Sequence, residues 1–218
     1  MSNMAWRTLT LLVIIAWFFG CATQVRELSD FKSHAQQGDY AYIAEQKITC
    51  AANSRGCNQI NLIKGDACFR LAEGGDSGHW DCAIQHLSRG LDMTGGTRTD
   101  MDSTQPYNEN LLEALRQRRD LAASNAEATP FTDQLETRAQ TFLQAFPTAP
   151  AGYYYLASAQ LTQALDIADT SPSAACRRLN DLLSLLTRAP TEAGRYTESL
   201  RRVQTDVHGA KSTVSGCI

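Results

Sequence analysis

The sequence contains none of the short motifs that mark the commonest enzyme classes. It has no Gly-x-Ser-x-Gly elbow, no His-Glu-x-x-His zinc motif and no glycine-rich phosphate-binding loop. Histidine is scarce, and His34 and His208 stand far apart without a pattern of paired carboxylates. Scattered histidines are more often surface or core residues than catalytic bases. We therefore expect a protein without enzymatic activity and without a cofactor.

The chain also lacks a strong excess of charge of either sign. Its formal net charge is −3. Residues 1–20 contain Arg7 and no acidic residue, so without them 20 − 1 = 19 basic side chains face 23 acidic ones, a net charge of −4. The densest basic cluster, Arg116 with Arg118 and Arg119, is short enough to be one solvated helix face. Because phosphate neutralisation needs clustered basic residues, we expect no nucleic-acid partner.

Strand-like alternation of apolar and polar residues is nearly absent, and beyond residue 20 no stretch is apolar enough to span a bilayer. Apolar residues recur instead at helical spacing, most clearly from Phe131 to Phe146. Short turns separate the helical stretches and imply antiparallel neighbours, so the sequence predicts an all-α fold of helical hairpins. The expected helices cover residues 25–37, 40–52, 58–73, 79–93, 107–126, a stretch opened by Thr129 and Pro130, 152–168, a stretch between Ser173 and Pro190, and a last one through 196–207.

The first 20 residues have the pattern of a signal peptide. Arg7 forms a short positive region, and Leu9 to Phe19 is an apolar run too short to span a hydrocarbon core of about 30 Å. The run ends in Gly20 and Cys21, and Phe18 rules out an ordinary cleavage site with two small residues. The alternative is an uncleaved membrane anchor with an incidental cysteine.

The residues Phe18-Phe19-Gly20-Cys21 resemble the lipobox of bacterial lipoproteins, which ends in a small residue and a cysteine. The two phenylalanines depart from the usual residues of that motif. The resemblance implies that residues 1–20 are removed and that Cys21 is acylated, which anchors the protein because each buried methylene contributes about 0.8 kcal/mol. In enteric-type bacteria an Asp after this cysteine retains a lipoprotein in the inner membrane. Ala22 at that position implies the outer membrane.

An even set of six cysteines follows Cys21. In an exported domain six cysteines indicate three disulfides, because that compartment is oxidising. Six cysteines allow 15 pairings, and the sequence alone does not select one. The turns between the expected helices rank first the pairings Cys50–Cys57 and Cys68–Cys82, and the remaining pair, Cys176–Cys217, would tie the polar tail back to a helix.

A zinc site is the alternative for part of this set. His79, Cys82 and His86 share one face of an expected helix, and Cys68 could be a fourth ligand. A disulfide-bonded cysteine cannot bind zinc, so the even count favours three bridges and no metal.

Several stretches resemble tetratricopeptide-like repeats. The expected helix that begins at Trp80 resembles the second helix of such a repeat. Trp80 occupies its aromatic position, Ala83 and Gly90 its small positions, and Leu87 its bulky position. Four other stretches also resemble parts of such repeats: Gly65 to Phe69, Gly38 to Tyr40, Phe142 to Pro147 and Pro150 to Ala157. The last two also resemble helical lipoproteins of outer-membrane assembly machines. The turn from Cys50 to Cys57 resembles the cysteine-clamped turns of Sel1-like repeats. The resemblance implies a right-handed solenoid, with an irregular helical bundle as the alternative.

These patterns divide the chain as follows: signal peptide 1–20, N-terminal helical-repeat region 21–93, linker 94–106, C-terminal helical-repeat region 107–208 and an irregular polar tail 209–218. The linker is rich in Gly, Thr and Asp, which makes it the best internal boundary.

A lipid-anchored series of hairpins implies an outer-membrane scaffold that faces the periplasm and binds a protein of a secretion, pilus or envelope assembly complex. The candidate anchors are Tyr153, Tyr154 and Tyr155, since aromatic residues are favoured at binding hot spots. Consecutive helical residues point in different directions, so at least one of the three is expected in the core. The alternatives are a small-molecule receptor subunit of a transporter and a Sel1-like penicillin-binding or hydrolase activity.

Overall fold

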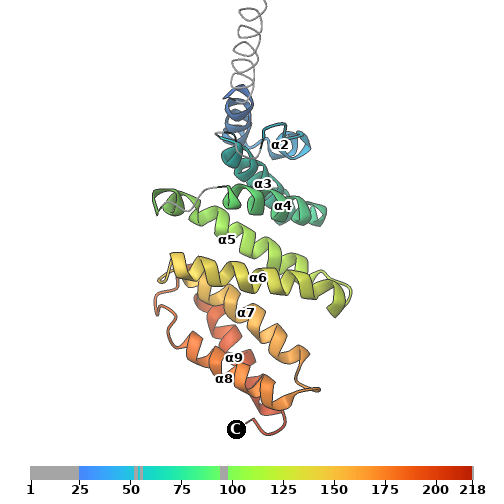
Figure 1. The fold of residues 1–218 in the computed structure, drawn as a ribbon, viewed down its shortest axis with the longest axis vertical. Coiled ribbons are helices and arrows are strands. Elements are labelled where there is room, and N and C mark those ends of the chain that lie inside the picture. The colour runs from blue at the N-terminus through green and yellow to red at the C-terminus, as the bar shows by residue number, and fades with distance from the viewer. Residues whose placement is uncertain (1–24, 52–53, 55, 94–97, 218) are drawn as a thin grey trace, which may run out of the picture. The chain divides into compact units, whose positions relative to one another are not determined.

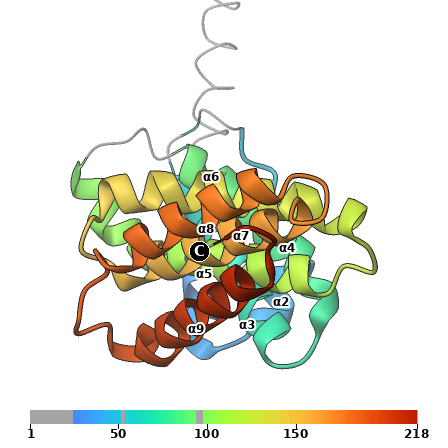
Figure 2. The ribbon, with the colours of Figure 1, turned by 90° about the horizontal axis from the view of Figure 1, so that it is seen from below.

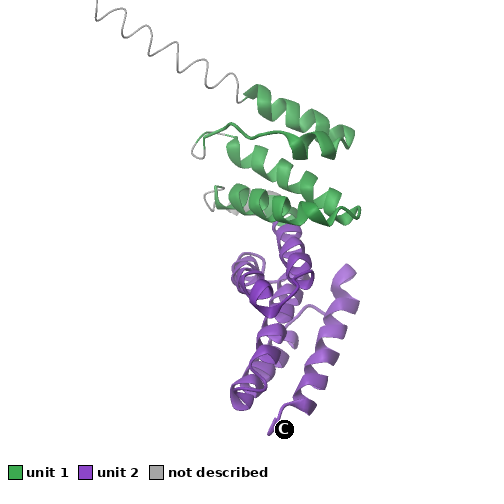
Figure 3. Cartoon of the chain, turned by 90° about the vertical axis from the view of Figure 1, so that its right-hand side faces the viewer, with its two compact units in different colours: residues 1–107 green, residues 108–218 purple. Residues whose placement is uncertain are grey.

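The computed structural model describes residues 25–51, 54, 56–93 and 98–217, without the side chains of 98–103 (Figure 1). Throughout these residues the regular structure is helical, and no strand is present. The prediction of an all-α, disulfide-stapled fold is confirmed. The chain forms two compact units, residues 1–107 and 108–218 (Figure 3).

The first unit is built around a small core under its first described helix, residues 25–37. Phe31 of this helix packs with Ile43, Ile60 and Ala67, all at most 2% exposed. The unit continues with α2 (Tyr40–Glu45), α3 (Cys57–Glu73), the 3-10 turn η1 (Ser77–His79), α4 (Trp80–Asp92) and the start of α5 (Arg98–Asp120). The first helix ends at Gly38, whose φ of +74° favours glycine.

Helices α3 and α4 form a close antiparallel hairpin. A Cβ on Gly65 of α3 would lie 2.7 Å from the backbone nitrogen of Leu87 in α4. A Cβ on Gly90 of α4 would lie 2.7 Å from Cγ of Leu62, one turn earlier in α3. At the turn of the hairpin, the Phe69 and Trp80 rings meet edge to face at 5.6 Å. Small residues thus let the two helix backbones approach closely.

The second unit contains the rest of α5, then α6 (Asn125–Ala145), α7 (Pro150–Asp166), α8 (Pro172–Leu186), the 3-10 turn η2 (Gly194–Tyr196) and α9 (Thr197–Thr213). Helix α7 packs against α6, α8 and α9 (Figure 2). Helices α6 and α7 are antiparallel, because Gly152 at the start of α7 faces Leu143 while Gln163 near its end reaches Asp133. Fully buried leucines fill the core, among them Leu111, Leu112, Leu115, Leu135, Leu179 and Leu182.

The pairings Cys50–Cys57, Cys68–Cys82 and Cys176–Cys217 are confirmed. Their Cα–Cα distances are 5.6, 5.9 and 5.3 Å. The first bridge spans the turn before α3, the second joins α3 to α4, and the third ties the end of the chain to α8. Both sulfur ligands of the alternative zinc site are therefore oxidised, which excludes that site.

Five helix boundaries differ from the expectation by more than three residues. Helix α5 ends at Asp120 rather than at residue 126. The expected helix 40–52 ends at Glu45, because Gln46 takes an extended conformation and its carbonyl accepts a hydrogen bond from Lys64 Nζ. Helix α6 begins at Asn125 rather than after Thr129. Its N-cap, Ser124, accepts from the Glu127 backbone N–H, while the Glu127 carboxylate accepts from the N–H of Ala123, the residue before the N-cap.

The other two differences extend helices into segments expected to be irregular. Helix α5 begins at Arg98, so residues 98–106 of the expected linker are helical and residues 94–97 lie outside the described part. No glycine or proline occurs from 98 to 105 to stop that helix. Helix α9 runs to Thr213, into the expected tail, because Ala210 and Val214 are buried. Among the described helices, none is long and apolar enough to cross a membrane.

Candidate functional site

The three consecutive tyrosines at the start of α7 have different environments. Tyr153 is 9% exposed and donates a hydrogen bond to the carbonyl of Pro147 at 3.0 Å. Tyr155 is 3% exposed, and Tyr154 between them is half-buried. As helical geometry led us to expect, part of the set packs into the core. Tyr154 is the member whose side chain remains accessible to a partner.

A hydrogen-bonded network centred on Glu113 of α5 fixes this end of α7. The Glu113 carboxylate accepts from Tyr155 Oη at 2.9 Å, from Arg116 Nε at 2.9 Å and from Gln117 Nε2 at 2.7 Å. Arg116 also contacts Asp120 at 2.7 Å. A largely buried carboxylate with several donors is stable as an anion, so the network holds α5 against α7.

The electrostatics of the network keep Glu113 ionised. Burial alone would raise the pKa of the Glu113 carboxyl, but hydrogen bonds from Arg116, Gln117 and Tyr155 outweigh it, and the pKa is lowered. Burial, and then the Glu113 charge, raises the pKa of Tyr155 far above its ordinary value. The tyrosine is therefore a permanent donor and the glutamate a permanent acceptor near neutral pH.

A second acidic residue of α5 extends the network to the last helix. Tyr196 Oη donates to Glu109 Oε2 at 3.0 Å, and Arg195 lies against the same carboxylate. Burial and the Glu109 charge raise the pKa of Tyr196 to about 12. The Tyr196 ring lies 5.8 Å from that of Tyr154 and 5.9 Å from that of Tyr155. Glu109 thereby joins the aromatic cluster to the start of α9.

Tyr154, with the adjacent Arg116, is our candidate partner-binding site. The Tyr154 ring packs on Tyr155 at 4.8 Å between centroids, which restrains it without covering it. Burial raises the pKa of Tyr154, although the charge of Arg116 opposes it, so the hydroxyl stays neutral. A half-exposed tyrosine held rigid next to an arginine has the composition of an interface hot spot.

The hydroxyl of Tyr155 should contribute measurably to stability. We expect Tyr155→Phe to lower the free energy of unfolding by roughly 1.5–2 kcal/mol, because it removes a hydrogen bond to an ionised carboxylate. The matched control is Tyr153→Phe, which removes a bond to a neutral carbonyl and should cost about 0.5–1 kcal/mol. Urea unfolding followed by circular dichroism measures both, and equal losses would contradict the role given to Glu113.

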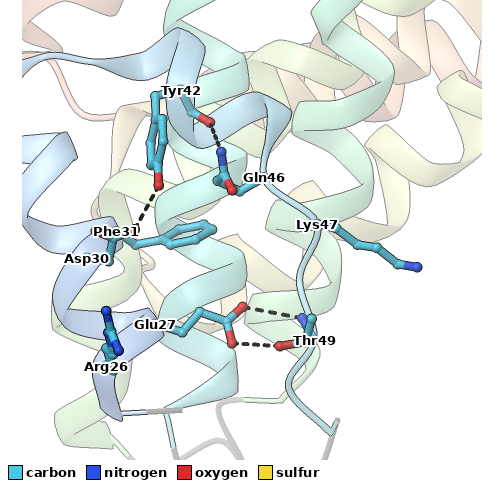
Figure 4. Close-up of a pocket in the computed structure, with 8 residues that line it drawn as sticks. All are labelled: Arg26, Glu27, Asp30, Phe31, Tyr42, Gln46, Lys47 and Thr49. Carbon is cyan, nitrogen blue, oxygen red and sulfur yellow. Dashed lines mark hydrogen bonds between the residues drawn. The ribbon is translucent and has the colours of Figure 1, made fainter. Parts of the chain in front are cut away.

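The first unit contains a pocket of about 400 Å³ between its first helix and the extended segment after α2 (Figure 4). It is lined by Arg26, Glu27, Asp30, Phe31, Tyr42, Gln46, Lys47 and Thr49. Glu27 accepts hydrogen bonds from the Thr49 backbone N–H at 3.3 Å and hydroxyl at 3.0 Å, and Asp30 accepts from Tyr42 Oη at 3.1 Å. Both carboxylates are thus engaged within the unit, whereas Figure 4 shows Lys47 directed away from the other lining residues.

The histidines of the alternative zinc site have other partners. His79 Nδ1 lies 3.1 Å from Asp76 Oδ2. His86 Nδ1 lies 3.0 Å from Asn61 Oδ1, and Asn61 is fully buried. Because the Asn61 amide nitrogen donates to the Cys57 carbonyl, its oxygen faces His86, and the ring donates from Nδ1. Within the described residues, no group of three His, Cys, Asp or Glu side chains is placed to hold a metal ion.

His86 should make the first unit less stable in acid. Burial, followed by the charges of Lys64 and Arg89, lowers the pKa of His86 from 6.5 to about 4. The unfolded chain therefore binds more protons between these two values, and stability present above pH 6.5 is lost as the pH falls toward 4. We expect a loss of about 1–2 kcal/mol, since the ring keeps some contact with water.

Urea unfolding across this pH range, followed by Trp80 fluorescence, measures the effect, because Trp80 lies at the start of the same helix. His86→Gln can still donate to Asn61 and should flatten the profile. His208→Gln, an exposed position in α9, is the control and should leave the profile unchanged. An unchanged profile in His86→Gln would assign the acid sensitivity to other groups.

Sequence reasoning missed Glu109, Glu113, Arg195 and the pocket. The contacts of Tyr155 with Glu113 and of Tyr196 with Glu109 join residues 42 and 87 positions apart, and no local pattern reports such pairs. Cys21, the expected acylation site, lies outside the described residues.

No protein-family model, curated protein or solved structure matches the chain. The resemblances to lipoproteins and helical repeats therefore rest on the residues quoted for them.

Proposed function

We propose that this chain is a lipoprotein of the bacterial outer membrane, anchored at Cys21, whose helical hairpins form a scaffold for a protein of a secretion, pilus or envelope assembly complex. The observation that carries the proposal is the pairing of all six cysteines after Cys21. Three bridges in one small protein are characteristic of an oxidising compartment. The remaining cysteine is the one that follows the apolar run and Gly20, where an acylated residue belongs.

The scaffold role is supported by how the hairpins are stabilised. Glycines at the α3–α4 interface, a bridge between these helices and the Glu113 network in the second unit all restrain backbone elements. A rigid surface binds a partner without the entropic cost of ordering itself. Tyr154 and Arg116 are the residues that we expect to contact the partner.

The pocket of the first unit fits the alternative of a small-molecule receptor less well. Seven of its eight lining side chains carry a charged, amide or hydroxyl group, and only Phe31 is wholly apolar. Pockets for small molecules are mostly apolar with a few polar groups.

Processing at Cys21 tests the anchor. Cys21→Ser should leave an unprocessed or mislocalised precursor, whereas the wild type should yield a mature form whose N-terminal peptide carries acyl chains by mass spectrometry. Ala22→Asp is the matched variant, which should still be processed but be retained in the inner membrane of an enteric-type host. Wild-type processing of Cys21→Ser would overturn the lipoprotein proposal.

Thiol chemistry gives an independent test of the compartment. Alkylation of the unreduced mature protein should modify none of the six cysteines that form bridges, and reduction should expose all of them. Several free thiols in protein taken from cells would reject an oxidising location.

Photocrosslinking tests the partner site. A photoreactive phenylalanine in place of Tyr154 should give a discrete adduct with one envelope protein in intact cells, and Tyr154→Ala should weaken co-purification of that protein. The control position is Gln140, which is exposed on α6. The same adducts from both positions would remove Tyr154 from the interface.

A further inference from the structure

The first described helix begins very close to the proposed anchor. Only Ala22, Thr23 and Gln24 separate Cys21 from Val25. Because each residue spans at most about 3.6 Å, Val25 lies within about 14 Å of the acylated cysteine. If Cys21 is acylated as we propose, this limit keeps the start of the helix within reach of the lipid headgroups.

The start of this helix has an exposed apolar side chain. Val25 is 71% exposed, more than Leu121 at 55% and Leu165 at 49%, the other large exposed apolar residues of the described chain. Isolated exposed apolar residues are common in soluble proteins. Val25, however, can contact the bilayer surface as well as water, because the acyl chains on Cys21 would hold it near that surface.

Two basic side chains line the pocket beside this helix. Arg26 and Lys47 are exposed and line opposite sides of the pocket (Figure 4). The neighbouring acids, Glu27 and Asp30, accept the hydrogen bonds of Thr49 and Tyr42, which orients their oxygens toward the protein. The groups left for an external ligand are a guanidinium and an ammonium, and both bind phosphate well.

We infer that this end of the first unit rests on the bilayer that holds the anchor, with Val25 at the headgroup level and lipid phosphates against Arg26 and Lys47. A phospholipid surface combines phosphates with an apolar layer directly beneath them, which matches a valine beside two basic residues. The first unit would thus be docked on the membrane and not merely tethered to it.

Tryptophan fluorescence can test this docking, because Trp80 is the only tryptophan after residue 20 and is 5% exposed. The acylated full-length mature protein carrying Val25→Trp is reconstituted into vesicles of phosphatidylethanolamine and phosphatidylglycerol, with or without a brominated phosphatidylcholine. We expect bromine to quench the new tryptophan roughly twofold. The matched control is Gln36→Trp, an exposed site about 16 Å further along the helix, which should not be quenched.

Charge reversal tests the role of the phosphates. Adding Arg26→Glu and Lys47→Glu to Val25→Trp should reduce quenching to the level of Gln36→Trp. The charge-matched control adds Arg177→Glu and Arg188→Glu, two exposed positions in the second unit, and should leave quenching as it was. Circular dichroism verifies that each variant is folded.

The outcomes separate the two proposals. Absence of acyl chains on Cys21 would overturn both. An acylated protein that floats with the vesicles but shows equal quenching at positions 25 and 36 would overturn the docking alone. Unchanged quenching after reversal of Arg26 and Lys47 would overturn the phosphate contacts.

Discussion

Gly65→Ala is expected to lower the free energy of unfolding by about 3 kcal/mol, a large effect for the addition of one methyl group. The new Cβ would lie 2.7 Å from the backbone nitrogen of Leu87 and 2.7 Å from its Cγ. A side chain can rotate away from such a contact, but a backbone atom moves only if the two helices separate. Separation of α3 and α4 would in turn loosen the packing of Leu87, which is fully buried.

Urea unfolding followed by Trp80 fluorescence measures this loss, because Trp80 reports on the same hairpin. The matched control is Gly209→Ala in α9, where the new Cβ meets nothing within 4 Å. That substitution should stabilise the protein by about 0.5–1 kcal/mol through helix propensity alone. If Gly65→Ala were as stable as the wild type, the close approach of α3 and α4 would be wrong.

Removal of the Cys176–Cys217 bridge is expected to destabilise the protein more than removal of either other bridge. In the chain-entropy account of disulfides, stabilisation grows with the length of the closed loop. The sequence separations of 41, 14 and 7 residues correspond to about 4, 3 and 2 kcal/mol for the Cys176–Cys217, Cys68–Cys82 and Cys50–Cys57 bridges.

Each bridge is removed by a double replacement with serine, which avoids an unpaired thiol, and thermal unfolding is followed by circular dichroism. Loss of Cys176–Cys217 should also make residues 214–217 sensitive to protease, since the bridge holds this segment to α8. The reverse order of stabilities would show that packing around the bridges, and not loop closure, dominates their contribution.

The sequence predicted the parts of this fold that depend on neighbouring residues. The bridges Cys50–Cys57 and Cys68–Cys82 were predicted because each joins consecutive cysteines that flank a turn, and Cys176–Cys217 followed because it was the pair that remained. The helix at residues 25–37 was predicted with the bounds that the structure has, since Gly38 and Asp39 stop it. The small residues Gly65 and Gly90 were recognised from spacing within two adjacent helices.

Other features were missed because competing local signals or distant contacts decide them. Ser124 and Thr129 could both cap this helix, α6, and Ser124 does so because its hydroxyl accepts from Glu127 N–H while the Glu127 carboxylate accepts from Ala123 N–H. The helix at Tyr40 stops early because Lys64, 18 residues away, holds Gln46 in an extended segment. Within the Glu113 network, the bonds from Arg116 and Gln117 follow helical spacing, but the bond from Tyr155 depends on tertiary packing and has no signal in the sequence.

The consecutive order of the bridges has a consequence for how an exported chain matures. A polypeptide that crosses a membrane from its N-terminus delivers its cysteines in sequence order, and each one here pairs with the next to arrive. Oxidation in order of arrival therefore yields the native set directly, without a step in which a wrong bridge is broken and exchanged. Each bridge also lies within one compact unit, so the first unit can acquire both of its bridges without waiting for any cysteine of the second.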